Sequence, residues 1–109
     1  MRLSESELSA VTTAFQEITI ANRVHGELLL FGSRTSDAKR GGDIDLLWIC
    51  PQSEIETVRR LKFDLISRIQ FYSEPQRIDL TIVARESTSS DPFYRSIKKD
   101  LVPLINCPS

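Results

Sequence analysis

The chain has few of the residues and motifs that identify common classes of binding site. Its 109 residues include only two cysteines and one histidine, and Cys50 and Cys107 form no C-x-x-C pair. Metal sites with that cysteine spacing are therefore excluded, and we expect both thiols to be buried and inert. The GxxxxGK[ST] and GxGxxG patterns of the common nucleotide-binding loops do not occur either.

An excess of charge of either sign is also missing. The chain has 14 basic and 15 acidic residues and a formal net charge of -1. This balance gives no electrostatic reason to expect direct binding to nucleic acid or to an anionic membrane. Because no signal peptide and no long apolar run is evident, we expect a cytoplasmic protein.

The composition that remains is that of one globular domain. Hydrophobic residues make up 40% of the chain and charged residues 27%, which is typical of a folded rather than a disordered protein. A chain of this length can form one compact core but not two ordinary domains. We therefore predict a single domain spanning residues 1–109.

Hydrophobic periodicity and turn residues predict a small mixed β-sheet with helices packed against it, an α/β fold with the order α-β-β-α-β-α and an optional last strand. S-x-x-E capping boxes begin two of the helices, and an Asp-Pro pair begins the third. The predicted elements are a helix from Ser4 to about Asn22, strands at Glu27–Phe31 and Asp43–Cys50, a helix from Ser53 to about Phe71, a strand at Arg77–Val83, a helix from Asp91 to about Asp100, and a short edge strand at Val102–Ile105.

Two features outside the strands have a plain structural interpretation. His25 lies in the loop after the first helix, and we interpret it as an ordinary surface residue. The apolar side chains near the C-terminus would supply either an interface or part of the core, and core packing is the simpler hypothesis. They are Phe93, Tyr94, Ile97, Leu101, Val102 and Leu104.

Three aspartates on two predicted strands are the candidate catalytic residues. Asp43 and Asp45 are two positions apart, so their side chains share one face of a strand. If the strand with Asp79 lies beside them, all three carboxylates meet on that face. Such a cluster needs a cation, and an all-oxygen ligand set favours Mg²⁺ or Mn²⁺ over zinc. The alternative is structural: Asp43 caps a turn, and Asp79 pairs with Arg77 or another basic residue.

A bend at Gly32-Ser33 precedes these aspartates. Glycine allows a sharp turn and a close approach of the backbone to a ligand, and exposed N–H groups after such a bend attract phosphate. Lys39 and Arg40 in the following loop could reach a triphosphate or could simply be solvated. The alternative is structural: the bend is simply a turn that ends the strand.

Taken together, FGSR, then DID, then RIDL on a later strand resembles the nucleotidyltransferase superfamily related to DNA polymerase β. The short chain is most similar to the minimal nucleotidyltransferase (MNT) proteins, over roughly residues 28–83. The resemblance implies that Gly32 and Ser33, with Arg34 beside them, bind the triphosphate. It implies two Mg²⁺ ions, with Asp43 and Asp45 binding the metals that carry the nucleotide. Many relatives have serine directly before the first aspartate, where this chain has Gly42.

The resemblance also implies a role for Asp79 and a partner. Asp79 would bind the catalytic metal and help to deprotonate the attacking hydroxyl. MNT proteins are typically paired with a HEPN ribonuclease toxin, which they neutralise as an antitoxin. We therefore expect transfer of AMP from ATP to a toxin hydroxyl, with tyrosine as the acceptor. Transfer to a small-molecule hydroxyl and neutralisation by binding alone remain alternatives, and Arg77 and Arg85 are further possible phosphate contacts.

Overall fold

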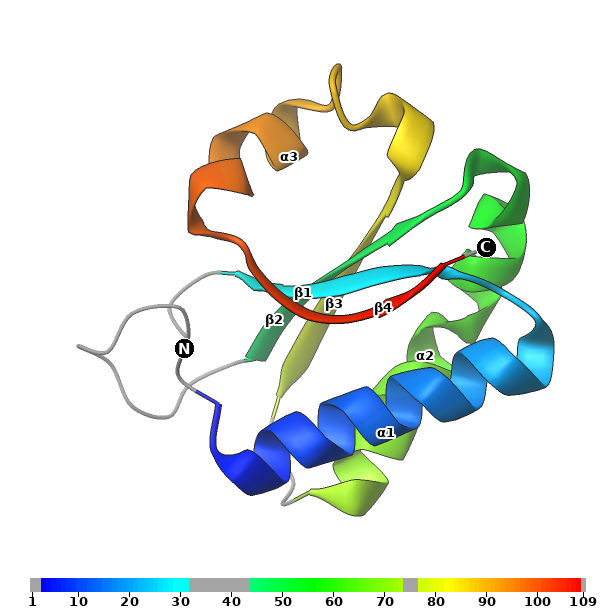
Figure 1. Cartoon of the computed structure of the whole chain (residues 1–109), viewed down its shortest axis with the longest axis vertical. Helices are drawn as coiled ribbons and strands as arrows, with labels where there is room; N and C mark the ends of the chain where they lie inside the picture. The colour runs from blue at the N-terminus through cyan, green and yellow to red at the C-terminus, as the bar shows by residue number, and fades with distance from the viewer. Residues whose placement is uncertain (1–2, 32–43, 74–76, 109) are drawn as a thin grey trace.

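The protein is a single β-sheet with two long helices on one face and one short helix on the other. The computed structural model describes residues 3–31, 44–73 and 77–108. Within these ranges the sheet has the strand order β3-β2-β1-β4, with β2 and β3 parallel and the other neighbours antiparallel. Helices α1 and α2 cover one face and α3 lies over the other (Figure 1). The elements are α1 (Glu5–Asn22), β1 (Gly26–Phe31), β2 (Ile44–Cys50), α2 (Ile55–Tyr72), β3 (Ile78–Ala84), α3 (Pro92–Ile97) and β4 (Val102–Cys107).

The order and class of these elements confirm the predicted α/β fold. Two of the three predicted helix starts are also confirmed. The Glu7 N–H donates to Ser4 Oγ at 3.1 Å and the Ser4 N–H donates to Glu7 Oε1 at 2.9 Å, which completes the capping box. The Tyr94 N–H donates to Asp91 Oδ1 at 3.1 Å, as expected for an aspartate before Pro92.

The third predicted start, a capping box at Ser53 and Glu56, is wrong. Residues 52–54 form a 3₁₀ turn, and α2 begins at Ile55 without a side-chain cap. The Glu54 carboxylate instead accepts from the His25 N–H at 2.7 Å and lies 2.6 Å from His25 Nδ1. The half-buried His25 side chain therefore ties the α1–β1 loop to the 3₁₀ turn between β2 and α2, a contact that spacing in the sequence did not reveal.

The larger core lies between the sheet and helices α1 and α2. Trp48 is fully buried and packs edge to face against Phe15, with ring centroids 4.9 Å apart. Its Nε1 donates to the His25 carbonyl at 3.1 Å, which satisfies the buried indole. Gly26 has φ +139°, and a Cβ there would lie 2.3 Å from the Ile49 carbonyl oxygen. Only glycine fits at this position.

The smaller core lies under α3, on the opposite face. Leu29, Leu47, Ile49 and Val83 project from β1, β2 and β3 and form one buried cluster. Tyr94, Ile97 and Leu101 pack against it, while Val102 and Leu104 pack against the larger core. The hypothesis that the C-terminal apolar residues belong to the core is confirmed for these side chains. The last predicted helix is shorter than expected, because residues 98–100 form a 3₁₀ turn.

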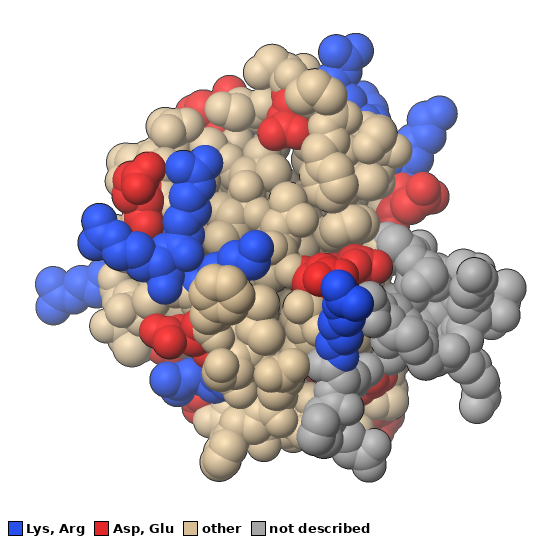
Figure 2. Space-filling view, turned by 180° about the vertical axis from the view of Figure 1, so that it is seen from behind, with Lys and Arg blue, Asp and Glu red and all other residues tan. Residues whose placement is uncertain are grey.

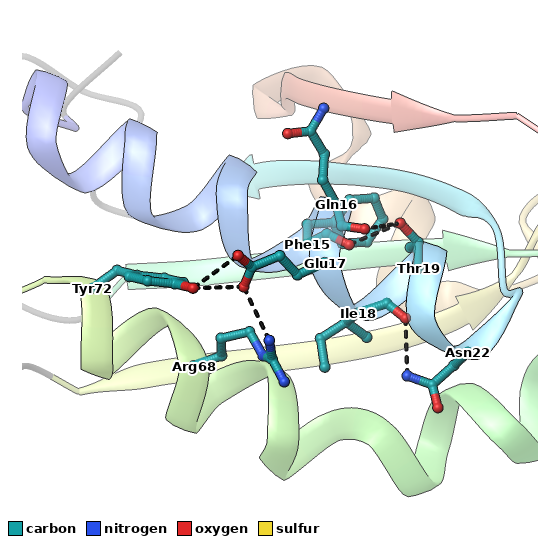
Figure 3. A network of polar contacts seen from close by, with 8 residues as sticks. All are labelled: Phe15, Gln16, Glu17, Ile18, Thr19, Asn22, Arg68 and Tyr72. Carbon is teal, nitrogen blue, oxygen red and sulfur yellow. Dashed lines mark hydrogen bonds and ion pairs between the residues drawn. The ribbon is translucent and has the colours of Figure 1, made fainter.

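Helices α1 and α2 are joined by a polar contact at their outer surface (Figure 3). The Tyr72 hydroxyl lies 2.7 Å and 2.8 Å from the two carboxylate oxygens of Glu17, and Arg68 Nη1 lies 3.0 Å from Glu17 Oε1. The hydrogen bond from Tyr72, followed by that from Arg68, lowers the pKa of Glu17, while the same carboxylate raises the pKa of Tyr72. This contact fixes the Tyr72 ring at the end of α2.

The two cysteines differ from each other. Cys50 is buried at the end of β2, and its burial raises the pKa of the thiol to about 11. Cys107 is half-buried on the edge strand β4, so the prediction of a buried thiol is correct for Cys50 only. None of the helices in the described ranges has the length and apolar character needed to cross a bilayer.

Candidate active site

The parallel pairing of β2 and β3 brings two of the predicted carboxylates together. The register pairs Asp45 directly with Asp79. Both side chains project to the α3 side of the sheet, because their neighbours Ile44 and Leu80 belong to the core on the opposite face. Neighbouring strands lie about 4.8 Å apart, so the predicted juxtaposition of these aspartates is confirmed. Asp43, Gly32, Ser33 and Arg34 lie outside the described residues.

Arg77 lies beside this pair. Its Nε is 4.0 Å from Asp79 Oδ1, and the two side chains are 75% and 52% exposed. Such a solvent-exposed ion pair contributes only about 0–1 kcal/mol to stability, so a ligand can displace it at little cost. On the face that Figure 2 shows, acidic and basic side chains lie close together at several places. The structural alternative for Asp79, a pairing with Arg77, is therefore present but weak.

An aromatic wall adjoins the carboxylates, which spacing in the sequence did not reveal. Phe31 is the cross-strand partner of Asp45 in the antiparallel pair of β1 and β2. Phe93 of α3 packs edge to face on Phe31 at 5.5 Å and remains 40% exposed. The signal for this wall is the register of β1 against β2, which a single sequence does not give.

The donor set can be tested against a metal ion. In residues 3–31, 44–73 and 77–108, no group of three or more His, Cys, Asp and Glu side chains is arranged to hold a metal. The described site therefore offers two carboxylates, Asp45 and Asp79. Mg²⁺ is commonly held by one or two carboxylates together with the phosphates of a substrate, so the residues present fit this ion when a nucleotide accompanies it.

A hollow of about 470 Å³ opens on the same face of the sheet, at its other end. Ile49 in its lining is four residues along β2 from Asp45, a separation of about 13 Å. A small acceptor bound there would not reach the carboxylates. Arg85 also lines this hollow, so the structure does not bring this predicted phosphate contact to the site; His25, before β1, lies at the same far end. The lining residues are Glu27, Ile49, Arg85, Thr88, Tyr94, Asn106 and Pro108.

Comparison with known proteins identifies a solved structure with a similar fold. No protein-family model matches the chain, and no curated protein sequence matches it. Among solved structures, it is similar to a candidate nucleotidyltransferase from Sulfolobus solfataricus, with a TM-score of 0.55 and 18% identity over 97% of this chain and 92% of that one. At this identity the likeness shows the fold alone. The chain has a small nucleotidyltransferase-like fold.

Proposed function

We propose that the chain is a Mg²⁺-dependent nucleotidyltransferase that transfers AMP from ATP to a hydroxyl of a partner protein. The observation that carries the proposal is the direct register of Asp45 with Asp79 on one exposed sheet face. A fold similar to that of a candidate nucleotidyltransferase supports it. Two carboxylates side by side on one sheet face are also the kind of oxygen ligand that Mg²⁺ takes together with the phosphates of a substrate.

The two described aspartates would hold the ion, with Asp43 as the third ligand implied by the family resemblance. Mg²⁺ bound there would neutralise charge on the triphosphate and on the departing pyrophosphate. The bend at Gly32-Ser33, with Arg34, would bind the triphosphate through backbone N–H groups. Arg77, whose Nε lies 4.0 Å from Asp79 Oδ1, would contact a phosphate oxygen of the bound nucleotide.

Asp79 lies on the outermost strand and is half exposed, so an acceptor can approach it from solvent. In the reaction, the acceptor oxygen forms a bond to the α-phosphorus of ATP. The bond from that phosphorus to the bridging oxygen breaks, and pyrophosphate leaves with the electron pair. Asp79 would accept the proton of the attacking hydroxyl.

The acceptor is proposed to be a tyrosine of a HEPN ribonuclease toxin, and the chain to be its antitoxin. The toxin partner follows from the resemblance to MNT proteins. Two observations support an acceptor presented from outside. Asp79 is half exposed at the end of the incompletely covered face, and the hollow on this face is about 13 Å away along β2.

The test is transfer of label from [α-³²P]ATP to the protein encoded by the adjacent gene. We expect labelling by the wild type with Mg²⁺ and a loss of about 100-fold or more in Asp45→Asn and Asp79→Asn, since changes even in residues that only support a metal ligand cost about 10- to 100-fold. Glu56→Gln is the matched control, because Glu56 is an exposed carboxylate on α2, on the other side of the sheet.

Equal labelling by wild type and both aspartate variants would refute the proposed site. A partner that is bound and neutralised without any labelling, equally by wild type and variants, would favour the masking alternative. Labelling of a small molecule in place of the protein would favour the small-molecule alternative.

A further inference from the structure

The hollow on the α3 side of the sheet has a floor that the strand register defines. Glu27 of β1 lies between Ile49 of β2 and Asn106 of β4, and Ile49 lies opposite Val83 of β3. Ile49 and Val83 belong to the small core on this face. Residues paired across strands share a face, so Glu27 and Asn106 project to the same side. The volume of about 470 Å³ is in the range of small-molecule sites.

The walls of the hollow come from the segments that follow β3. Tyr94 of α3 packs against the small core and lines the hollow. Arg85 begins the 3₁₀ turn after β3, and Thr88 follows its last residue. The Thr88 hydroxyl donates to the Arg85 carbonyl at 2.9 Å. The Gln52 N–H donates to Glu86 Oε1, also at 2.9 Å. The backbone that carries Arg85 is therefore fixed both to its own turn and to the turn after β2.

Two opposite charges line this hollow. Among residues 3–31, 44–73 and 77–108, no hydrogen bond or ion pair engages the guanidinium of Arg85 or the carboxylate of Glu27. Two strand spacings across the sheet and two residues along β3 separate them, so their Cα atoms lie about 12 Å apart. With both side chains upright and a hydrogen bond of about 2.9 Å at each end, the charged groups of a bridging ligand would lie about 6 Å apart.

We propose that this hollow binds a small zwitterion of dipeptide length. Its carboxylate contacts Arg85, and its ammonium group contacts Glu27. In an extended dipeptide the terminal nitrogen and the carboxylate carbon are about 6 Å apart, whereas in a single amino acid they are about 2.5 Å apart. Ile49, Tyr94 and Pro108 supply apolar contact for a side chain of the ligand. The ligand is neutral overall, as is the pair of side chains that receives it.

The ligand contacts the same short helix that borders the candidate active site. Tyr94 lines the hollow, and Phe93 beside it packs on Phe31. Phe31 is the cross-strand partner of Asp45. A ligand held against Tyr94 therefore stabilises α3 on the sheet, and amide hydrogen exchange in α3 slows when the ligand binds. The site stands on the geometry of the hollow and does not depend on the proposed transferase activity.

The first test titrates the ¹⁵N-labelled full chain with the dipeptide alanyl-leucine. We expect saturable shifts of the amides that line the hollow, among them Glu27, Ile49 and Arg85, with a Kd of about 1 mM for a ligand of this size. N-acetyl-alanyl-leucine lacks the ammonium group and alanyl-leucine amide lacks the carboxylate, so each should bind at least about 10-fold more weakly. Free leucine, whose charges are too close together, should bind as weakly as these. No saturable shifts around the hollow at up to about 10 mM, or equal binding of all four probes, would overturn the proposal.

Two substitutions assign the charged ends of the ligand. Arg85→Gln and Glu27→Gln should each weaken binding of alanyl-leucine about 10-fold. Glu27→Gln should leave the affinity for the N-acetyl peptide unchanged, and Arg85→Gln should leave that for the amide unchanged, because the matching group is already missing. Arg95→Gln, at an exposed position of α3 outside the hollow, is the matched control and should bind like the wild type. Losses that add in full, or an equal loss in Arg95→Gln, would contradict the assignment.

Discussion

The two faces of the sheet differ in how completely they are covered and in what they carry. On one face, two 18-residue helices enclose a core that includes fully buried Trp48 and Phe15. On the other face, the six-residue helix α3 covers a small apolar cluster, and Asp45 and Asp79 lie at the end of the same face. Charged groups are costly to bury, so carboxylates that must meet a metal and a nucleotide belong on the incompletely covered face. The large core that stabilises the fold and the candidate catalytic carboxylates therefore lie on opposite faces of the same strands.

Leu46 and Leu47 give the sharpest test of this difference, because they are adjacent in β2 and both are fully buried, on opposite faces. We expect Leu46→Ala to lower the free energy of unfolding by about 4 kcal/mol and Leu47→Ala by about 2–3 kcal/mol. The smaller cluster can collapse around the cavity because only a short helix covers it. Urea denaturation measures the free energy of unfolding of both variants, and we expect their m-values to equal that of the wild type. A larger loss for Leu47→Ala would reverse the assignment of stability to the two-helix face.

Substitutions at the helix caps test the same difference between the two faces, with smaller expected changes in stability. Ser4→Ala removes the hydroxyl oxygen that accepts from the Glu7 N–H in the capping box of α1, and we expect a loss of about 1 kcal/mol in global stability. Asp91→Ala removes the corresponding cap of α3. Its global effect should be smaller, because so short a helix can open locally without unfolding the sheet. Thermal unfolding compares the two, and hydrogen exchange of α3 amides should rise in Asp91→Ala alone.

The smallest effect is expected at the surface contact between α1 and α2. The pKa of Glu17 is lowered from its ordinary value of 4.5, chiefly by the Tyr72 hydroxyl. A carboxylate whose pKa is lower in the folded state stabilises that state above its unfolded pKa, and this contribution is lost as the pH falls through the folded pKa. Glu17→Gln should therefore be slightly less stable than wild type at pH 7 and equally stable well below pH 4.5. A difference in melting temperature that does not change with pH would contradict this.

Local sequence chemistry predicted the fold best where the deciding contacts are local. The caps at Ser4 and Asp91 depend on residues three positions apart, and both are confirmed. The capping box predicted at Ser53 and Glu56 is wrong because Pro51 and a 3₁₀ turn shift the start of α2 to Ile55, and Glu54 binds His25, 29 residues away. No local pattern encodes such a contact. The last strand was also predicted too short, since it continues to Cys107.

The candidate site was predictable to the extent that strand alternation determines it. The alternation of side chains along each strand, with the two strands taken as neighbours, predicted that Asp45 and Asp79 share a face of the sheet. It did not predict that the two residues lie directly opposite each other. The aromatic wall of Phe31 and Phe93 depends on pairing between separate segments, which spacing does not reveal. The roles of Asp43, Gly32, Ser33 and Arg34 rest on the sequence resemblance and remain predictions.

The central claim is that Asp45 and Asp79 hold a divalent ion with a nucleotide. Its most direct test adds Mn²⁺ and a non-hydrolysable ATP analogue to the ¹⁵N-labelled chain and follows paramagnetic broadening of backbone amides. The claim predicts broadening that is strongest at the starts of β2 and β3, around Asp45 and Asp79, and that falls toward their far ends, Cys50 and Ala84, with loss of the effect in Asp45→Asn and Asp79→Asn. Broadening that is strongest at the far ends, or equal broadening in wild type and both variants, would contradict it.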